Sequence, residues 1–231
     1  MSLGIIEINI ILLSLKIAFF STLITTIFGF LIAFYLEKSQ SWISFLVDVL
    51  VSLPLLMPPV IIGYALLWIF SPLSPIGTVI ENLFGNSIVF TWVAASLAAA
   101  IVSLPLVVNM FRVSLLNIGP ELENSAKTLG LSNIQIFLFI IIPVAKKGLI
   151  AGIMLGFFRS LAEFGATITF VSNIPGETRT LSLALYTVSS IPGTDYIALR
   201  LVIISILLAF FAISISEILN RRSLRKSRGL D

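Results

Sequence analysis

The sequence contains no cysteine and no histidine, and charged residues make up only 11% of its 231 residues. Without cysteine the chain has no disulfide framework, no thiol nucleophile and no Cys-ligated metal. The absence of histidine removes the commonest general base and metal ligand. Soluble proteins carry about 25% charged residues, so the shortage of charge excludes an ordinary soluble domain. We therefore expect no catalytic, cofactor-binding or metal-binding residues, and no enzymatic activity of the chain itself.

Apolar residues account for 58% of the chain, and the mean hydropathy is +1.12. Five charge-poor stretches of about 22 to 28 residues are each long enough to cross a hydrocarbon core of about 30 Å as a helix. The sequence therefore predicts an all-α membrane protein, with one transmembrane domain at residues 9–220 and a basic tail at residues 221–231. The five expected spans are residues 9–36, 49–70, 87–111, 148–171 and 197–219.

The positions of lysine and arginine indicate how these spans are oriented, because cytoplasmic loops are enriched in both residues. One set of loops, with the C-terminal tail, carries ten of them, whereas the other carries Arg179 and Arg200, with Lys16 near the N-terminal end. We expect a multi-pass protein of the cytoplasmic (inner) membrane, with its N-terminus outside and its C-terminus in the cytoplasm. The ten cytoplasmic residues are Lys38, Arg112, Lys127, Lys146, Lys147, Arg221, Arg222, Arg225, Lys226 and Arg228.

Residues 119–135, between the third and fourth spans, contain a polar island from Glu123 to Gly130 that belongs in water rather than in lipid. Gly119-Pro120 favours a helix start, because proline at the first helical position lacks only a donor that has no partner there. Gly130 is typical of a helix end that needs a left-handed residue, and Ser132 or Asn133 can cap a second helix. The loop is thus predicted to be two short cytoplasmic helices joined by a glycine corner. An ordinary helical loop without a partner is the simpler alternative.

The spacing from Glu123 through Gly130 to Pro143 resembles the cytoplasmic EAA loop of ABC-type importer permeases, although Asn124 and Ser125 depart from its core triplet. The resemblance implies that the first short helix docks on an ATPase. The chain contains no Walker-type Gly-x4-Gly-Lys-Ser/Thr motif, so the ATPase is expected to be a separate protein. The residues expected to dock are Glu121, Glu123, Asn124, Ser125, Ala126, Leu129, Gly130 and Leu131.

Three prolines, Pro54, Pro58 and Pro59, interrupt the second expected span. Proline inside a spanning helix removes hydrogen bonds and kinks the helix. Such breaks persist at membrane depth only where protein or a water-filled cavity satisfies the freed carbonyl groups. We therefore expect a bent helix that lines or gates a transport pathway. The alternative is a kink with a structural role alone.

Arg159 and Glu163 stand four residues apart in the fourth expected span, and on a continuous helix they share one face. Ionisable residues inside a membrane segment are candidates for a functional site, so both are candidates for the pathway or its gate. Each neutralises the other, however, and this favours a structural ion pair that orients the helix.

Two longer stretches extend the resemblance to one family. Ser160 to Thr180 reads SLAEFGATITFVSNIPGETRT, and the second span contains Pro54-Leu55-x-x-Pro58-Pro59-x-x-x-Gly63; both are similar to the molybdate ABC transporter permease family. The resemblance covers about residues 12–216 and implies the type I ABC importer permease fold. It also implies a homodimer in the lipid bilayer, two copies of an ABC ATPase, an extracytoplasmic molybdate-binding protein and no nucleic-acid partner. Sulfate and tungstate are the alternative substrates.

Two other classes of membrane protein are alternatives. A secondary anion transporter driven by an ion gradient usually shows inverted repeats and paired broken helices, whereas here one span is visibly broken and no second half mirrors the first. A membrane anchor without transport activity would leave the prolines of the second span and the buried charges unexplained.

Overall fold

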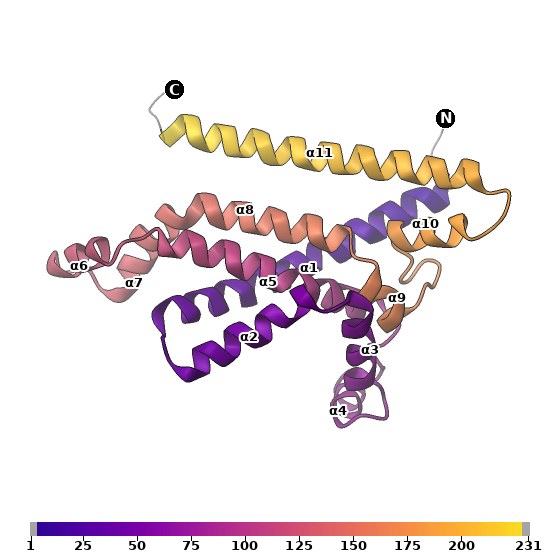
Figure 1. Cartoon of the computed structure of the whole chain (residues 1–231), viewed down its shortest axis with the longest axis horizontal. Coiled ribbons are helices and arrows are strands. Elements are labelled where there is room, and N and C mark those ends of the chain that lie inside the picture. Colours follow the sequence, from indigo (N-terminus) through magenta and orange to yellow (C-terminus); the bar gives the residue numbers. More distant parts are fainter. Residues whose placement is uncertain (1–3, 228–231) are drawn as a thin grey trace.

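The computed structural model describes residues 4–227, and all regular elements within that range are helices (Figure 1). The long helices are α1 (Ile5–Lys38), α5 (Trp92–Leu116), α8 (Ile142–Leu161) and α11 (Asp195–Ser227). Shorter elements join them: α2 (Trp42–Leu56), α3 (Pro59–Phe70), α4 (Pro75–Phe84), α6 (Pro120–Thr128), α7 (Asn133–Ile136), the π-helical turn η1 (Phe137–Ile141), α9 (Gly165–Val171) and α10 (Leu181–Ser189).

The central core is formed by α1, α5 and α8, and α8 approaches α5 along a stripe of glycines. These glycines, Gly148, Gly152 and Gly156, recur at every fourth residue and therefore lie on one face of α8. A Cβ on Gly152 would lie 2.7 Å from Phe111 Cε1, and a Cβ on Gly156 would lie 2.7 Å from Val107 Cγ2. Only glycine allows the two backbones to come this close, as is common where helices pack within membranes.

The next residue of this stripe is Ser160, whose buried hydroxyl group forms hydrogen bonds to the neighbouring helices. Ser160 Oγ lies 2.7 Å from Ser21 Oγ of α1, and it donates a hydrogen bond to Ser103 Oγ of α5. Ser103 Oγ in turn donates to the carbonyl oxygen of Ala99, 2.8 Å away. These contacts join all three core helices by hydrogen bonds in a region where an unpaired hydroxyl would be costly.

Charged residues mark the ends of the uncharged segments of α1 and α5. The segment of α1 between Lys16 and Glu37 is uncharged, and so is the part of α5 that precedes Arg112. Each segment has about 20 residues, which spans about 30 Å at 1.5 Å per residue and matches the hydrocarbon core. Within the described residues, three helices are long and apolar enough to cross a membrane. They are α1, α5 and the continuous helix Asn133–Leu161, which contains α7, η1 and α8.

The second expected span, residues 49–70, is corrected by the structure. It consists of two helices, α2 and α3, which meet at Met57–Pro58 with a bend of 118°. Pro58 and Pro59 provide no backbone N–H donors, so the helix cannot continue through them. The break lies where the prolines predict it, but the bend is far sharper than the kink expected of one bent helix.

The fourth expected span, residues 148–171, is also corrected. The helix begins at Asn133 and ends at Leu161, and α9 starts in a new direction at Gly165 (Figure 1). The π-helical turn η1 precedes Pro143, which lacks the N–H that an α-helix would use there. The third expected span is shifted, because α5 covers Trp92–Leu116 rather than residues 87–111.

The first and fifth expected spans each lie within a longer helix, α1 and α11. Residues 221–227 of the expected basic tail continue α11, and residues 228–231 lie outside the described residues, as do the side chains of the whole tail. The number of five membrane crossings therefore stays a prediction.

The glycine stripe makes a specific prediction about stability. Gly152→Val places new atoms against Phe111, so it should lower the free energy of unfolding by about 1–3 kcal/mol through overpacking. The matched control is Ala151→Val, because Ala151 lies next to it on the exposed side of the same helix. Thermal unfolding of the detergent-solubilised variants measures the effect, and equal midpoints for the two variants would contradict the role assigned to the stripe.

Candidate functional site: an exposed helical turn and two broken helices

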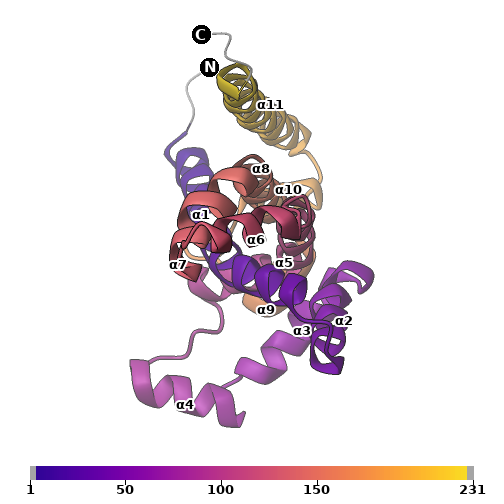
Figure 2. The same ribbon diagram turned by 90° about the vertical axis from the view of Figure 1, so that its left-hand side faces the viewer.

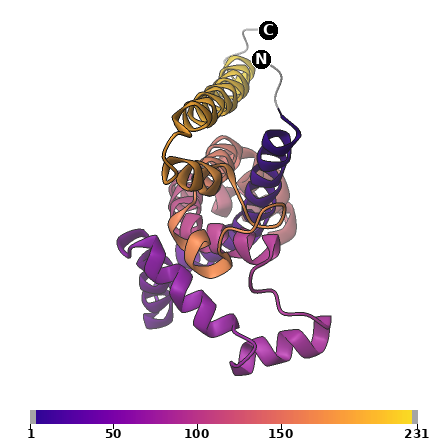
Figure 3. The same cartoon turned by 90° about the vertical axis from the view of Figure 1, so that its right-hand side faces the viewer.

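The turn formed by α6 and α7 lies at one end of the bundle, as Figure 2 shows from that side. The C-terminal end of α11 lies at the same end, whereas α9, α10 and the start of α1 lie at the opposite end, which Figure 3 faces. The local signals in the sequence are confirmed here. Pro120 occupies the first position of α6, and Ser132 caps α7 in a capping box with Gln135.

Gly130 forms the corner between the two short helices. Its φ is +84°, the left-handed region that favours glycine, and a Cβ added there would meet no atom within 4 Å. The N–H of Leu131 donates to the carbonyl oxygen of Ala126, and the N–H of Gly130 donates to that of Lys127. These two bonds close the end of α6 in a Schellman-type turn, so the requirement for glycine comes from the backbone conformation and not from crowding.

The residues expected to dock fall on two faces of the turn. Glu123 forms an ion pair with Lys38 of α1, Ala126 is buried among the bundle's own apolar side chains, and Leu131 is half-buried. The others are exposed, together with Leu122, which the sequence analysis does not select. The exposed members of the expected set are Glu121, Asn124, Ser125, Leu129 and Gly130.

The bend between α2 and α3 brings α3 against α9. Gly63 of α3 faces the backbone of Ala166 so closely that a Cβ at residue 63 would clash with it, and a Cβ on Gly165 would lie 2.9 Å from Pro59 Cβ. Thr169 Oγ1 also donates to the carbonyl oxygen of Val60, 3.2 Å away. The contact joins the second and fourth expected spans at the points where both are broken. Pro54 lies one helical turn earlier, inside α2.

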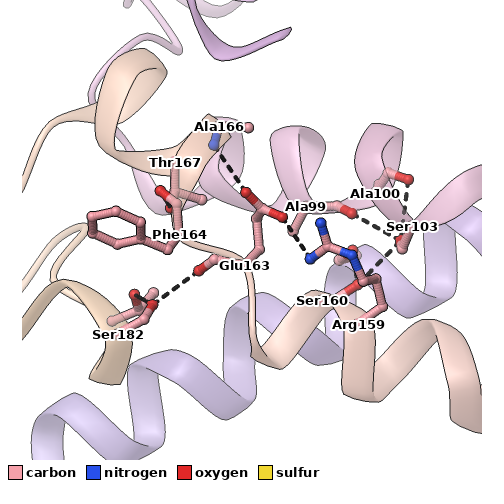
Figure 4. A network of polar contacts seen from close by, with 12 residues as sticks. Ala99, Ala100, Ser103, Arg159, Ser160, Glu163, Phe164, Ala166, Thr167 and Ser182 are labelled. Atoms are coloured by element: carbon pink, nitrogen blue, oxygen red, sulfur yellow. Dashed lines mark hydrogen bonds and ion pairs between the residues drawn. The ribbon is translucent and has the colours of Figure 1, made fainter. Parts of the chain in front are cut away.

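Glu163 occupies the break between α8 and α9 and contacts three elements (Figure 4). Its side chain is 2% exposed, and its Oε2 lies 2.7 Å from Arg159 Nη1, without a hydrogen bond of regular geometry. Its Oε1 accepts a hydrogen bond of 2.9 Å from the N–H of Ala166 at the start of α9, and its carbonyl oxygen accepts one from Ser182 of α10. The carboxylate thus satisfies irregular backbone and neutralises Arg159 at the same time.

Arg159 and Glu163 therefore pair as expected, but not on one continuous helix face, because α8 ends at Leu161. Arg159 lies 12 residues beyond Lys147, which is about 18 Å along the helix. With Lys147 at the edge of a hydrocarbon core of about 30 Å, Arg159 would lie close to its middle. An unpaired charge at that depth is costly. The geometry supports the interpretation of a structural pair that holds the break together.

The opposite end of the bundle carries a cavity of about 630 Å³ between α1 and the loop before α10, with Lys16, Arg179 and Asn9 in its lining. Lys16 Nζ lies 3.4 Å from the centroid of the Trp92 ring, a cation–π contact. The backbone N–H of Trp92 donates to Glu177 Oε1. Lys16, Arg179 and the loop that contains Glu177 therefore lie at the end of the bundle opposite the α6–α7 turn.

Two features of the structure are not predicted from the sequence. The glycine stripe has a recognisable signal, since small residues four apart are typical of helix contacts in membranes. The pairing of Lys38 with Glu123 has no signal, because the two residues are separated by 85 positions. No cluster of three or more Asp, Glu, His or Cys side chains that could hold a metal occurs in the described part of the chain.

Comparison with known proteins places the chain among transport permeases. The chain is 44% identical to the molybdenum transport system permease protein ModB of Escherichia coli (strain K12) over 213 residues, which cover 92% of this chain and 93% of that protein. It is 32% identical to the sulfate transport system permease protein CysT of Salmonella typhimurium, over 90% of this chain and 76% of that protein.

The fold is shared with a solved ABC importer. A chain of the MetNI methionine ABC transporter, solved in inward-facing conformations, aligns with a TM-score of 0.71 and 16% identity over 93% of this chain and 94% of that chain. The chain therefore has the type I ABC importer permease fold. The family model described as the binding-protein-dependent transport system inner membrane component matches residues 10–225. Because that match takes in nearly the whole chain, the protein belongs to the binding-protein-dependent inner-membrane permease family, whose members work with an ATPase and a substrate-binding protein.

Proposed function

We propose that this chain is the permease subunit of an ABC importer that carries molybdate across the cytoplasmic membrane, with ATP hydrolysed by a separate subunit. The observation that carries the proposal is the α6–α7 turn, which is exposed at one end of the bundle in a chain that is 44% identical to a molybdenum permease. The sulfate permease CysT is less similar at 32% identity, which favours molybdate over sulfate. Tungstate stays an alternative, because it is a tetrahedral dianion of nearly the same size.

The proposed orientation follows from the arrangement of the helix ends. The α6–α7 turn and the C-terminal end of α11 lie at the same end of the bundle (Figure 1). The sequence of that end of α11 is rich in arginine and lysine, which favours the cytoplasm. We infer that the C-terminus and the turn are cytoplasmic, and that the N-terminus and the cavity beside Lys16 and Arg179 face outward, toward the molybdate-binding protein.

The exposed face of α6 is the proposed docking surface for the ATPase. It combines acidic and polar residues with the exposed apolar side chains of Leu122 and Leu129. A short helix presented in this way suits insertion into a groove of a partner protein. Gly130 gives the turn a fixed corner, so a movement of the ATPase groove would displace the turn as a unit.

Two copies of the chain are proposed to form the permease. Helix α4 extends away from the bundle in both side views, and α3 leads to it from the contact with α9 (Figures 2 and 3). This arm exposes large apolar side chains, including Tyr64, Trp68, Leu73 and Phe84. A second copy would cover part of this surface and place the two α3–α9 contacts beside a shared pathway. Two permease copies would then engage two ATPase subunits.

The proposed function makes a first prediction, which concerns transport itself. Membrane vesicles that contain the chain, its ATPase and the molybdate-binding protein should take up molybdate only when ATP and the binding protein are both present. Radiolabelled molybdate uptake measures this, with a Walker-motif variant of the ATPase as the control. Uptake that continues without the ATPase, driven by an ion gradient, would support the secondary transporter instead.

The second prediction tests the corner of the turn. Gly130→Val forces a β-branched residue into a left-handed conformation at a cost of about 1–2 kcal/mol, so it should reorient the turn and lower uptake severalfold. Gly130→Asn is the matched control, because asparagine tolerates this conformation, and it should retain most of the uptake. Equal uptake by the two variants would show that the backbone conformation at Gly130 does not matter for transport.

The third prediction separates a structural from a transporting role of the buried ion pair. Glu163→Gln leaves Arg159 charged and unpaired, so it should lower the free energy of unfolding by about 3 kcal/mol. The double variant Arg159→Gln/Glu163→Gln removes both charges and should recover much of this loss. Thermal unfolding and uptake are measured for both variants. A double variant that is stable but does not transport would assign the pair to the pathway.

A further inference from the structure

Lys38 and Glu123 join the α6–α7 turn to α1. Lys38 is the last residue of α1, Glu123 lies in the first turn of α6, and Lys38 Nζ is 2.5 Å from Glu123 Oε1. The side chain of Glu123 is 17% exposed and that of Lys38 is 46% exposed. Glu123 is therefore turned toward its own bundle, and little of its carboxylate is available to another protein.

The pair lies beside apolar side chains at the end of α1. A small cavity beside it is lined by Phe34, Leu115, Ile118 and Ile141 together with Glu37, Lys38 and Glu123. Lys38 Nζ also lies 5.9 Å from the centroid of the Phe34 ring. The side chain of Lys38 is nearly half exposed, so water screens the pair in part, as in other ion pairs near a protein surface.

Apart from the chain connections to α5 and α7, the remaining attachment of α6 to the bundle is apolar and small. Ala126 is 4% exposed and packs within the cluster that includes Ile118, Ile136 and Ile141. Apolar contacts of this kind have no fixed direction, whereas an ion pair at hydrogen-bond distance fixes the position of one group relative to another. Lys38 and Glu123 therefore set where α6 sits on the end of α1.

Helix α1 extends from this pair to the other end of the molecule. It is 34 residues long, which corresponds to about 50 Å at 1.5 Å per residue. At its far end Glu7 pairs with Arg200 of α11, and Ser14 Oγ accepts a hydrogen bond from the N–H of Leu181 in α10. A displacement of α6 can thus reach α10 and α11 through one rigid helix.

We propose that the Lys38–Glu123 ion pair transmits the movement of α6 to α1, and that Glu123 is a positioning residue rather than an ATPase contact. The inference rests on the proposed function, since it assigns a role within ATP-driven transport. It gives the residues of this segment two roles. Glu123 and Ala126 hold the permease, and the exposed side chains of Leu122 and of Leu129, which follows α6, meet the ATPase.

The test compares single and exchanged charges in the complete importer. Lys38→Gln and Glu123→Gln should each lower the amount of molybdate taken up per ATP hydrolysed by about threefold or more, and leave the ATPase bound to the permease. The exchange Lys38→Glu/Glu123→Lys should return the ratio to within about twofold of the wild type. Lys127→Gln is the matched control, because it removes an exposed charge from the same short helix and should leave the ratio unchanged.

The readouts are uptake and ATP hydrolysis in the same vesicles, with co-purification of the ATPase as a measure of assembly. Unchanged ratios in both single variants would overturn the inference. Loss of the ATPase from Glu123→Gln, without recovery in the exchanged variant, would also overturn it, because Glu123 would then contact the ATPase directly. A wild type without ATP-driven uptake would overturn the proposed function and the inference together, so the two failures are distinguishable.

The absence of cysteine allows a second, independent measurement. Lys38→Cys/Glu123→Cys can be joined by a short thiol-reactive crosslinker in a permease chain without other thiols, assembled with partner subunits from which cysteine has been removed. If the pair stays closed while it transmits movement, the crosslinked importer should retain at least about half of its uptake. Crosslinking that abolishes uptake would show that α6 and α1 must separate during transport, and would overturn the inference.

Discussion

The close approach of α5 and α8 constrains the rest of this structure. In a bilayer the hydrophobic effect does not bring helices together, because lipid tails are as apolar as leucine side chains. The contact depends instead on the absence of side chains at Gly148, Gly152 and Gly156, and on the hydroxyl groups that follow at Ser160. A core packed in this way has little room to deform. Changes of shape are therefore expected at the two breaks outside it, after Leu56 and after Leu161.

Both breaks expose backbone groups that must find partners within the protein. At the second break Glu163 provides them: one carboxylate oxygen accepts the N–H of Ala166, and the other lies against Arg159. At the first, Pro58 and Pro59 remove donors and thus reduce the number of groups to be satisfied. The contact of Gly63 with α9 brings the proline break and the break at Glu163 next to each other. The charged pair and the prolines, which look unrelated in the sequence, serve one broken region.

The parts of the fold that depend on local chemistry could be predicted from the sequence. Pro120, Gly130 and Ser132 fix where α6 begins, where it ends and where α7 is capped, because each acts on its own backbone or on its neighbours. The 118° bend could not be predicted, since prolines indicate a break but not the direction that packing against α9 imposes. The end of α8 at Leu161 could not be predicted either, because the apolar sequence continues through residues 165–171. Contacts between distant residues, such as Lys38 with Glu123, carry no signal in a single sequence.

The division of roles proposed for α6 would have a consequence for how such transporters diversify. Glu123 and Ala126 rest on the bundle of the permease itself, while Leu122 and Leu129 are exposed. If the exposed side chains meet the ATPase as proposed, substitutions there would accommodate a different motor protein while the inner anchorage stays intact. Selection would then act on partner choice and on mechanical integrity at separate positions of one short segment.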